Sequence, residues 1–211
     1  MTKDPIDAFI DALVSVPSGK DFTNIYREHE SCRNNLALYL RFLRISGVKA
    51  VIVGEAPGYK GCARTGIPFT DEAHLYLLKK KIPGLKMINE DERRAPLKEL
   101  SAGTIWGVLH THKDTLVLMW NIYPYHPHKG RINSNRTPRK EETEKGLAFL
   151  YQLIKIFPGV PVYAIGRTAQ KRLGVSDDFY IRHPSHGGSR ICEKDLETKV
   201  YGANQVRTNS R

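Results

Sequence analysis

The sequence is poor in cysteine, in acidic side chains and in long apolar runs, and each shortage excludes a class of protein. The three cysteines, Cys32, Cys62 and Cys192, lie far apart and form no CxxC pair, so we expect reduced thiols and a cytoplasmic protein. No apolar run approaches the roughly 20 residues that a membrane-spanning helix needs. The chain also begins without the apolar segment of a signal peptide. We therefore expect no membrane partner.

Acidic residues are clearly outnumbered by basic ones. The chain has 22 Asp and Glu against 33 Lys and Arg, which gives a net charge of +11. Such an excess favours a polyanionic partner, with nucleic acid first and an anionic membrane surface second. We expect five cations to lie on loops around a binding cleft and to contact phosphates: Lys129, Arg131, Arg136, Arg139 and Arg190.

Neither a repeat nor a linker divides the chain, so we expect one monomeric domain over residues 1–211, with its core at about 48–190. N-terminal helices would precede this core in residues 1–47, and a frayed tail would follow it in 200–211. Short apolar runs predict strands at 51–53, 115–120, 160–165 and 179–181. Helical spacing predicts helices at 4–16, 31–45, within 73–113, at 141–157 and at 168–173. This alternation predicts an α/β protein, a three-layer α/β/α sandwich around a central, mostly parallel four-stranded sheet.

A polar residue follows each predicted strand: Glu55, Asn121, Thr168 and His183. Parallel strands joined by right-handed crossovers end at the same edge of a sheet, so we expect these four residues to converge on one cleft. The loop that contains Glu55 is not a P-loop, because it lacks the Gly-Lys-Ser/Thr ending and its carboxylate would repel a phosphate. Each residue alone also has a structural explanation, such as a loop-bracing carboxylate, a turn-forming asparagine or a structural histidine.

Several motifs resemble the uracil-DNA glycosylase superfamily, in particular its branch whose first motif reads GEAPG. These motifs are GEAPG at residues 54–58, GIPF at 66–69, the strand-end Asn121 and HPS at 183–185. The resemblance covers about residues 48–190. It implies a monofunctional DNA glycosylase that hydrolyses the N-glycosidic bond of uracil, or of a related deaminated base, in a nucleotide flipped out of DNA. It implies no metal and no redox cofactor.

The resemblance also implies a role for each matched residue. Asn121 would read uracil O4 and N3–H with its amide, and Phe69 would stack on the flipped base. His183 would donate to uracil O2 as charge develops there, aided by backbone N–H groups of the loop that starts at Gly54. Glu55 is the only carboxylate in the first motif and is our candidate for activating water. The expected DNA contacts are Ser185, Thr168, Arg190, Lys129 and Arg131, with Arg190 also the candidate wedge.

The sequence departs from the family pattern at three points. Ala56 stands where the best-known branch has a water-activating aspartate, so a non-catalytic DNA-binding protein on the same scaffold is an alternative. Gly58 stands where some branches use tyrosine to exclude the methyl group of thymine, so the resemblance does not imply strict selectivity for uracil. A second alternative is a glycosylase for another deaminated or damaged base, such as hypoxanthine. Three scattered cysteines do not match the four-cysteine iron–sulfur cluster of the GEAPG branch. A third alternative is a metal site, because six of the eight histidines form three close pairs, at 110/112, 126/128 and 183/186.

Overall fold

The central sheet has four parallel strands in the order β3-β2-β5-β6. The strands are β2 (Ala50–Gly54), β3 (Val117–Asn121), β5 (Val162–Ile165) and β6 (Tyr180–Ile181). Every residue of β2 and β3 is buried, which explains why both strands read as continuous apolar runs. The structure is a computed structural model and describes residues 3–88 and 95–202. It confirms the parallel four-stranded sheet, with β3 shifted by one or two residues from its predicted range.

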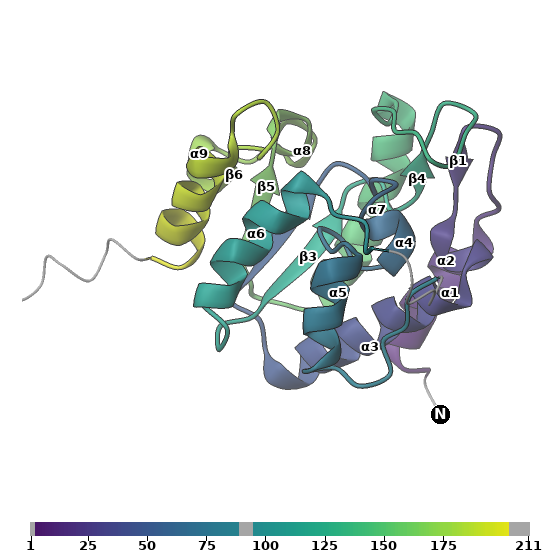
Figure 1. Cartoon of the computed structure of the whole chain (residues 1–211), viewed down its shortest axis with the longest axis horizontal. Coiled ribbons are helices and arrows are strands. Elements are labelled where there is room, and N and C mark those ends of the chain that lie inside the picture. Colours follow the sequence, from purple (N-terminus) through teal and green to yellow (C-terminus); the bar gives the residue numbers. More distant parts are fainter. Residues whose placement is uncertain (1–2, 89–94, 203–211) are drawn as a thin grey trace, which may run out of the picture.

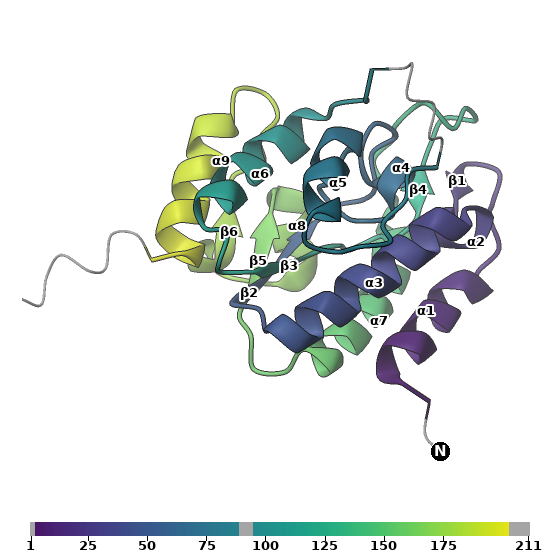
Figure 2. The same cartoon turned by 60° about the horizontal axis from the view of Figure 1, so that its bottom comes forward.

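Helices cover both faces of this sheet (Figures 1 and 2). The predicted helices are found as α1 (Pro5–Ser15), α3 (Glu30–Ser46), α7 (Lys140–Ile156) and α8 (Arg167–Leu173). The predicted helical region at 73–113 is interrupted. Its described part contains α5 (Glu72–Lys79) and α6 (Leu100–Thr111). In Figure 1, α5 and α6 lie in front of the sheet and α7 lies behind it. The three-layer sandwich predicted from the sequence is therefore confirmed.

Several short elements have no counterpart in the sequence prediction. They are β1 (Phe22–Thr23), α2 (Ile25–Glu28), α4 (Cys62–Thr65), β4 (His126–Pro127), η1 (Asp177–Phe179), α9 (Ser189–Asp195) and the π-helical turn η2 (Leu196–Val200). Helix α9 packs beside α6 (Figure 1). Leu196 and Val200 are buried, so the chain is packed up to this point. The predicted frayed tail falls mainly on residues 203–211, which lie outside the described residues.

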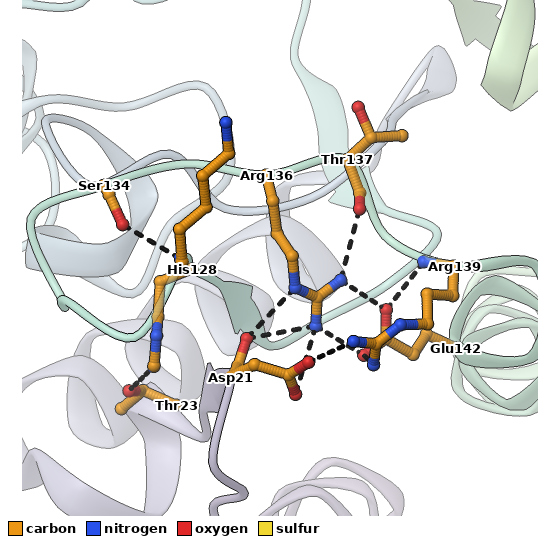
Figure 3. A network of polar contacts seen from close by, with 9 residues as sticks. Asp21, Thr23, His128, Ser134, Arg136, Thr137, Arg139 and Glu142 are labelled. Carbon is orange, nitrogen blue, oxygen red and sulfur yellow. Dashed lines mark hydrogen bonds and ion pairs between the residues drawn. The ribbon is translucent and has the colours of Figure 1, made fainter.

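A second, two-stranded sheet joins the N-terminal region to the basic loop at residues 125–139. In this sheet β1 pairs antiparallel with β4, and Phe22 lies opposite Pro127. Arg136 strengthens the junction, because its guanidinium donates to the Asp21 carbonyl and forms two hydrogen bonds of 2.6 and 2.7 Å with Glu142 (Figure 3). Paired guanidinium–carboxylate bonds of this kind fix geometry as well as adding energy. The basic loop is therefore anchored to two separate parts of the fold.

One hydrophobic core connects the elements from Ile6 in α1 to Val200. Trp120 of β3 is fully buried and packs against Phe9, with ring centroids 5.4 Å apart. The three cysteines are buried free thiols. Within residues 3–88 and 95–202, no helix is both long and apolar enough to cross a membrane.

Candidate active site

The carboxyl ends of the parallel strands meet at one edge of the sheet, where a pocket of about 190 Å³ opens. Gly54 at the end of β2 lies opposite Asn121 at the end of β3. The pairing continues beyond the strands, because the Tyr123 amide donates to the Glu55 carbonyl at 3.0 Å. The pocket is lined by Glu55, Ala56, Pro57, Gly58, Cys62, Phe69, Glu99, Ser101, Asn121, Asn135, Arg136 and His183. The structure thus brings Glu55, Asn121 and His183 together, as the strand-end argument predicts.

Phe69 and Asn121 approach each other over Gly54. A Cβ on Gly54 would collide with the Phe69 ring and lie 2.9 Å from Asn121 Oδ1, so only glycine leaves room for both. Phe69 has a φ of +53°, a left-handed conformation that is unusual for a bulky residue. The Trp106 ring N–H holds this turn by donating to the Phe69 carbonyl at 3.1 Å. Backbone strain of this type is concentrated at functional sites.

His183 is held with a defined ring orientation at the pocket. Its Nδ1 accepts the backbone N–H of Ser185 at 3.1 Å and lies 2.8 Å from the Ser185 hydroxyl. Because a backbone N–H can only donate, Nδ1 carries no proton, and the neutral ring has its proton on Nε2. Burial, followed by the charges of Arg182 and His186, lowers the pKa of His183. His183 is therefore a neutral donor at neutral pH.

Glu55 is a carboxylate with an unsatisfied oxygen. Its Oε1 is buried without a hydrogen-bond partner, and such an atom marks a position that water or a ligand can occupy. Burial raises the pKa of Glu55, and a hydrogen bond with Thr168 partly offsets this effect. Thr168 lies in the first turn of α8, so the structure places it beside the Glu55 carboxyl group.

Glu99 is a pocket residue that sequence reasoning missed. It directly precedes α6, and burial, followed by the negative charge of Asp71, raises its pKa to about 7. Burial by itself would raise the pKa of Asp71. Hydrogen bonds from His74 and from the Glu99 amide outweigh this effect, so the pKa of Asp71 is lowered. No motif surrounds Glu99. Two glycines, Gly58 and Gly61, leave space for its carboxyl oxygens, but this match is visible only in three dimensions.

The GEAPG loop is fastened to the basic loop at two points. His126 is fully buried, and its ring nitrogens lie 2.8 Å from the carbonyl oxygens of Pro57 and Ile132. Farther along, the Tyr59 amide donates to Asn135 Oδ1 at 3.0 Å. These contacts fix the position of the cations on the basic loop relative to the pocket.

The predicted DNA contacts lie in different environments. Lys129 and Arg131 are exposed, and Lys129 lines an open hollow of about 460 Å³ that shares Glu55, Asn135 and Arg136 with the pocket. Arg190 is exposed on α9 and does not line the pocket. The Ser185 hydroxyl lies within hydrogen-bond distance of Nδ1 of His183 and Nδ1 of His186.

Two of the expected phosphate-binding arginines form ion pairs within the protein. Arg136 is largely covered, with only 13% of its side chain exposed, and pairs with Glu142 and Asp21 (Figure 3). Arg139 pairs with the same two carboxylates. Arg136 is thus engaged in the protein's own structure, whereas Arg139 keeps 60% of its side chain exposed, and its contact with phosphates stays a prediction.

The histidine pairs do not assemble a metal site among the described residues. There, no group of three or more histidine, cysteine, aspartate or glutamate side chains is placed to hold a metal ion. His126 contacts two carbonyl oxygens, as above, while His112 contacts Glu197 at 2.6 Å and stacks on Tyr201.

Comparison with known proteins identifies the family. The family model described as "Uracil DNA glycosylase superfamily" matches residues 41–194. The chain is similar in fold to the crystal structure of wild-type Pedobacter heparinus SMUG2, with a TM-score of 0.65 and 15% sequence identity over 97% of this chain and 100% of that one. No curated protein matches the sequence significantly. Because the family model covers most of the chain, including both motif regions around the pocket, the protein belongs to the uracil DNA glycosylase superfamily, a family of DNA glycosylases.

Proposed function

We propose that this protein excises uracil from DNA by hydrolysing the N-glycosidic bond, as a monofunctional glycosylase without metal or redox cofactor. The observation that carries the proposal is the convergence at one sheet edge of three groups: the Asn121 amide, the His183 ring and a Glu55 carboxylate with an unsatisfied oxygen. The strained Phe69 lies beside them. Together these groups could stack on a flipped pyrimidine, recognise its edge and stabilise it as it leaves the sugar.

In this mechanism the uracil nucleotide leaves the stack and enters the pocket, because its glycosidic bond is unreachable inside the duplex. Phe69 provides the face on which the base stacks, and Asn121 presents a donor to O4 and an acceptor to N3–H. Only a base with this pattern satisfies both ends of the amide. Base recognition is thus assigned to side chains whose positions are fixed by strand ends.

Bond cleavage then follows. The bond between C1′ and N1 breaks, and its electron pair moves onto the uracil ring. The Nε2–H of His183 donates to O2, where part of the resulting negative charge gathers. A water molecule adds through its oxygen to the oxocarbenium-like C1′, and Glu55 takes up the proton that this water releases. The products are an abasic site and the uracil anion, which takes up a proton from solvent to become neutral uracil, and Glu55 returns its proton to solvent.

The Glu55 carboxylate takes the place of the missing acid at Ala56. Thr168 is better assigned to positioning this carboxyl group than to a phosphate, since the two side chains share a hydrogen bond. A glutamate of raised pKa is a competent base at neutral pH. For this reason we favour an enzyme over the alternative of a non-catalytic DNA-binding protein.

We infer that Lys129, Arg131, Arg190 and Ser185 contact the DNA backbone around the flipped nucleotide. Lys129 and Arg131 are exposed, and Lys129 lines the open hollow next to Glu55, which supports this assignment. We also propose that the protein acts as a monomer. Its buried free thiols fit a reducing, cytoplasmic compartment.

The test is single-turnover cleavage of labelled oligonucleotides that carry uracil, hypoxanthine, xanthine or a thymine mismatch, followed by alkali to cut abasic sites. We expect uracil excision by the wild-type protein and a strong loss in His183→Ala. An exposed α7 variant, Glu144→Gln, is the matched control and should behave as wild type. If the wild-type protein binds DNA tightly but releases no base, the enzymatic proposal fails and the binding protein is favoured.

A further inference from the structure

A second pocket lies away from the catalytic groups, towards the start of β3. It has a volume of about 250 Å³ and is walled by α3, α5, α6 and β3, and no described residue lines both pockets. Its inner surface is almost entirely apolar, with Phe42, Leu77 and Trp106 among the side chains that form it. Leu77 remains 42% exposed, so this apolar surface is open to solvent. Such a surface favours a partner that covers it.

The size of the second pocket and the state of β3 limit what can bind there. Small-molecule sites usually measure about 300–1,000 Å³, so this pocket is better matched to one or two apolar side chains. β3 lies at an edge of the sheet, but the Tyr39 hydroxyl donates to the Val117 carbonyl at 3.2 Å and accepts the Met119 amide at 3.0 Å. These bonds occupy backbone groups of the edge and disfavour the addition of a partner strand. The pocket therefore suits a side chain that a partner inserts.

Cations surround one end of the second pocket. Lys80 and Lys81 follow α5, Lys113 follows α6, and all three line the pocket, whereas none of its described lining residues is acidic. Lys81 Nζ donates to the Lys113 carbonyl at 2.8 Å, which joins the ends of the two helices and fixes one ammonium group there. In the described part of the chain, these three lysines have no carboxylate partner. His112 at the same end already contacts Glu197 at 2.6 Å.

We propose that the second pocket is a docking site for an acidic peptide segment of a partner protein, which inserts one bulky apolar side chain and places carboxylates against Lys80, Lys81 and Lys113. Charge decides between this occupant and two others. A second copy of the chain carries a net charge of +11, and residues 203–211 contain two arginines and no acid, so the cationic rim disfavours both. The catalytic groups lie at the other end of β3, so a partner docked here leaves them open to DNA.

The experiment follows tryptophan fluorescence during titration with a synthetic peptide that has one phenylalanine between two pairs of aspartates. Trp106 lines the second pocket and reports its occupation, whereas Trp120, the other tryptophan, is fully buried and packs against Phe9. We expect a saturable change at about 0.1 M salt, where charges more than about 10 Å apart are screened. Replacing the phenylalanine of the peptide by alanine should weaken binding by at least about tenfold. Replacing its aspartates by asparagines should weaken binding by about tenfold.

Variants of the protein separate docking in the pocket from attraction to a basic surface. Leu77→Asp and the double change Lys80→Glu with Lys113→Glu should each weaken binding of the acidic peptide by about tenfold or more. Lys145→Glu is the charge control, because Lys145 is exposed on α7, behind the sheet, and this variant should bind as wild type. Thermal unfolding followed by circular dichroism checks that each variant is folded.

Three results would overturn the inference, and none of them depends on glycosylase activity. The first is that the wild-type protein fails to bind the acidic peptide at millimolar concentration. The second is that the alanine or asparagine peptide, or the Leu77→Asp protein, binds as tightly as the original pair. The third is that dodecanoate binds while the acidic peptide does not, which would assign the pocket to a small amphiphilic anion instead of a protein partner.

Discussion

Replacing Glu99 by glutamine should stabilise the protein at pH 8 and much less at pH 5. Folding raises the pKa of Glu99 from 4.5 to about 7, through burial first and Asp71 second. An acid with a raised folded-state pKa favours folding only while it is protonated. The free energy of unfolding therefore carries no penalty from Glu99 below pH 4.5, falls as the pH rises from 4.5 towards 7, and stays at its lowest value above that.

The size of this effect follows from the shift. The difference between 7 and 4.5 is about 2.5 pKa units, or about 3 kcal/mol at 1.36 kcal/mol per unit. Most of this decrease in the free energy of unfolding occurs between pH 5 and pH 8. For a chain of this length, a gain of about 3 kcal/mol in Glu99→Gln corresponds to a rise in Tm of roughly 6–12 °C.

The assay is urea and thermal unfolding of the wild type and Glu99→Gln at both pH values, followed by circular dichroism. Glu144→Gln serves as the control, because its side chain is about half exposed on α7 and its contact with Lys140 is long, at 3.7 Å. Equal stability changes at pH 5 and pH 8 would show that Glu99 is ionised and hydrated in the folded protein.

Three further predictions concern catalysis and DNA binding. His183→Ala should lower the single-turnover rate by about 10²–10³ with little effect on binding, and Glu55→Gln by about ten- to a hundredfold; the reverse ranking would invert the two roles. Asn121→Asp should weaken uracil excision and improve cytosine excision, because a carboxylate cannot donate to O4 but accepts from the N4 amine; unchanged uracil excision would show that Asn121 does not read the base. The logarithm of DNA affinity should fall linearly with log salt, and Lys129→Ala and Arg131→Ala should each reduce the slope by about 0.9; an affinity that is insensitive to salt would contradict this.

The strand-end residues could be predicted because their position is a property of topology. The apolar runs that become β2 and β3 are buried on both faces, so composition alone distinguishes them from the amphipathic helices. Once the strands are parallel, their carboxyl ends must share an edge. Glu55, Asn121 and His183 therefore come together whatever the details of packing, and the pocket confirms this.

The short elements could not be predicted because they depend on partners distant in the sequence. β1 and β4 are two residues long, and each forms a strand only because it pairs with the other. Helix α9 is seven residues long, too short to show a period, and it packs on α6. Such segments gain their stability from tertiary contacts rather than from propensity.

The sequence by itself determined the sheet, its flanking helices and the identity of the strand-end polar residues, because local periodicity and chain connectivity carry that information. Only the tertiary structure decided which charged groups face the pocket. It turned Arg136 inward to Glu142 and Asp21, and it placed Glu99 against Gly58 and Gly61. The charge state of a side chain depends on its burial and on its neighbours in space, and neither is written in the local sequence.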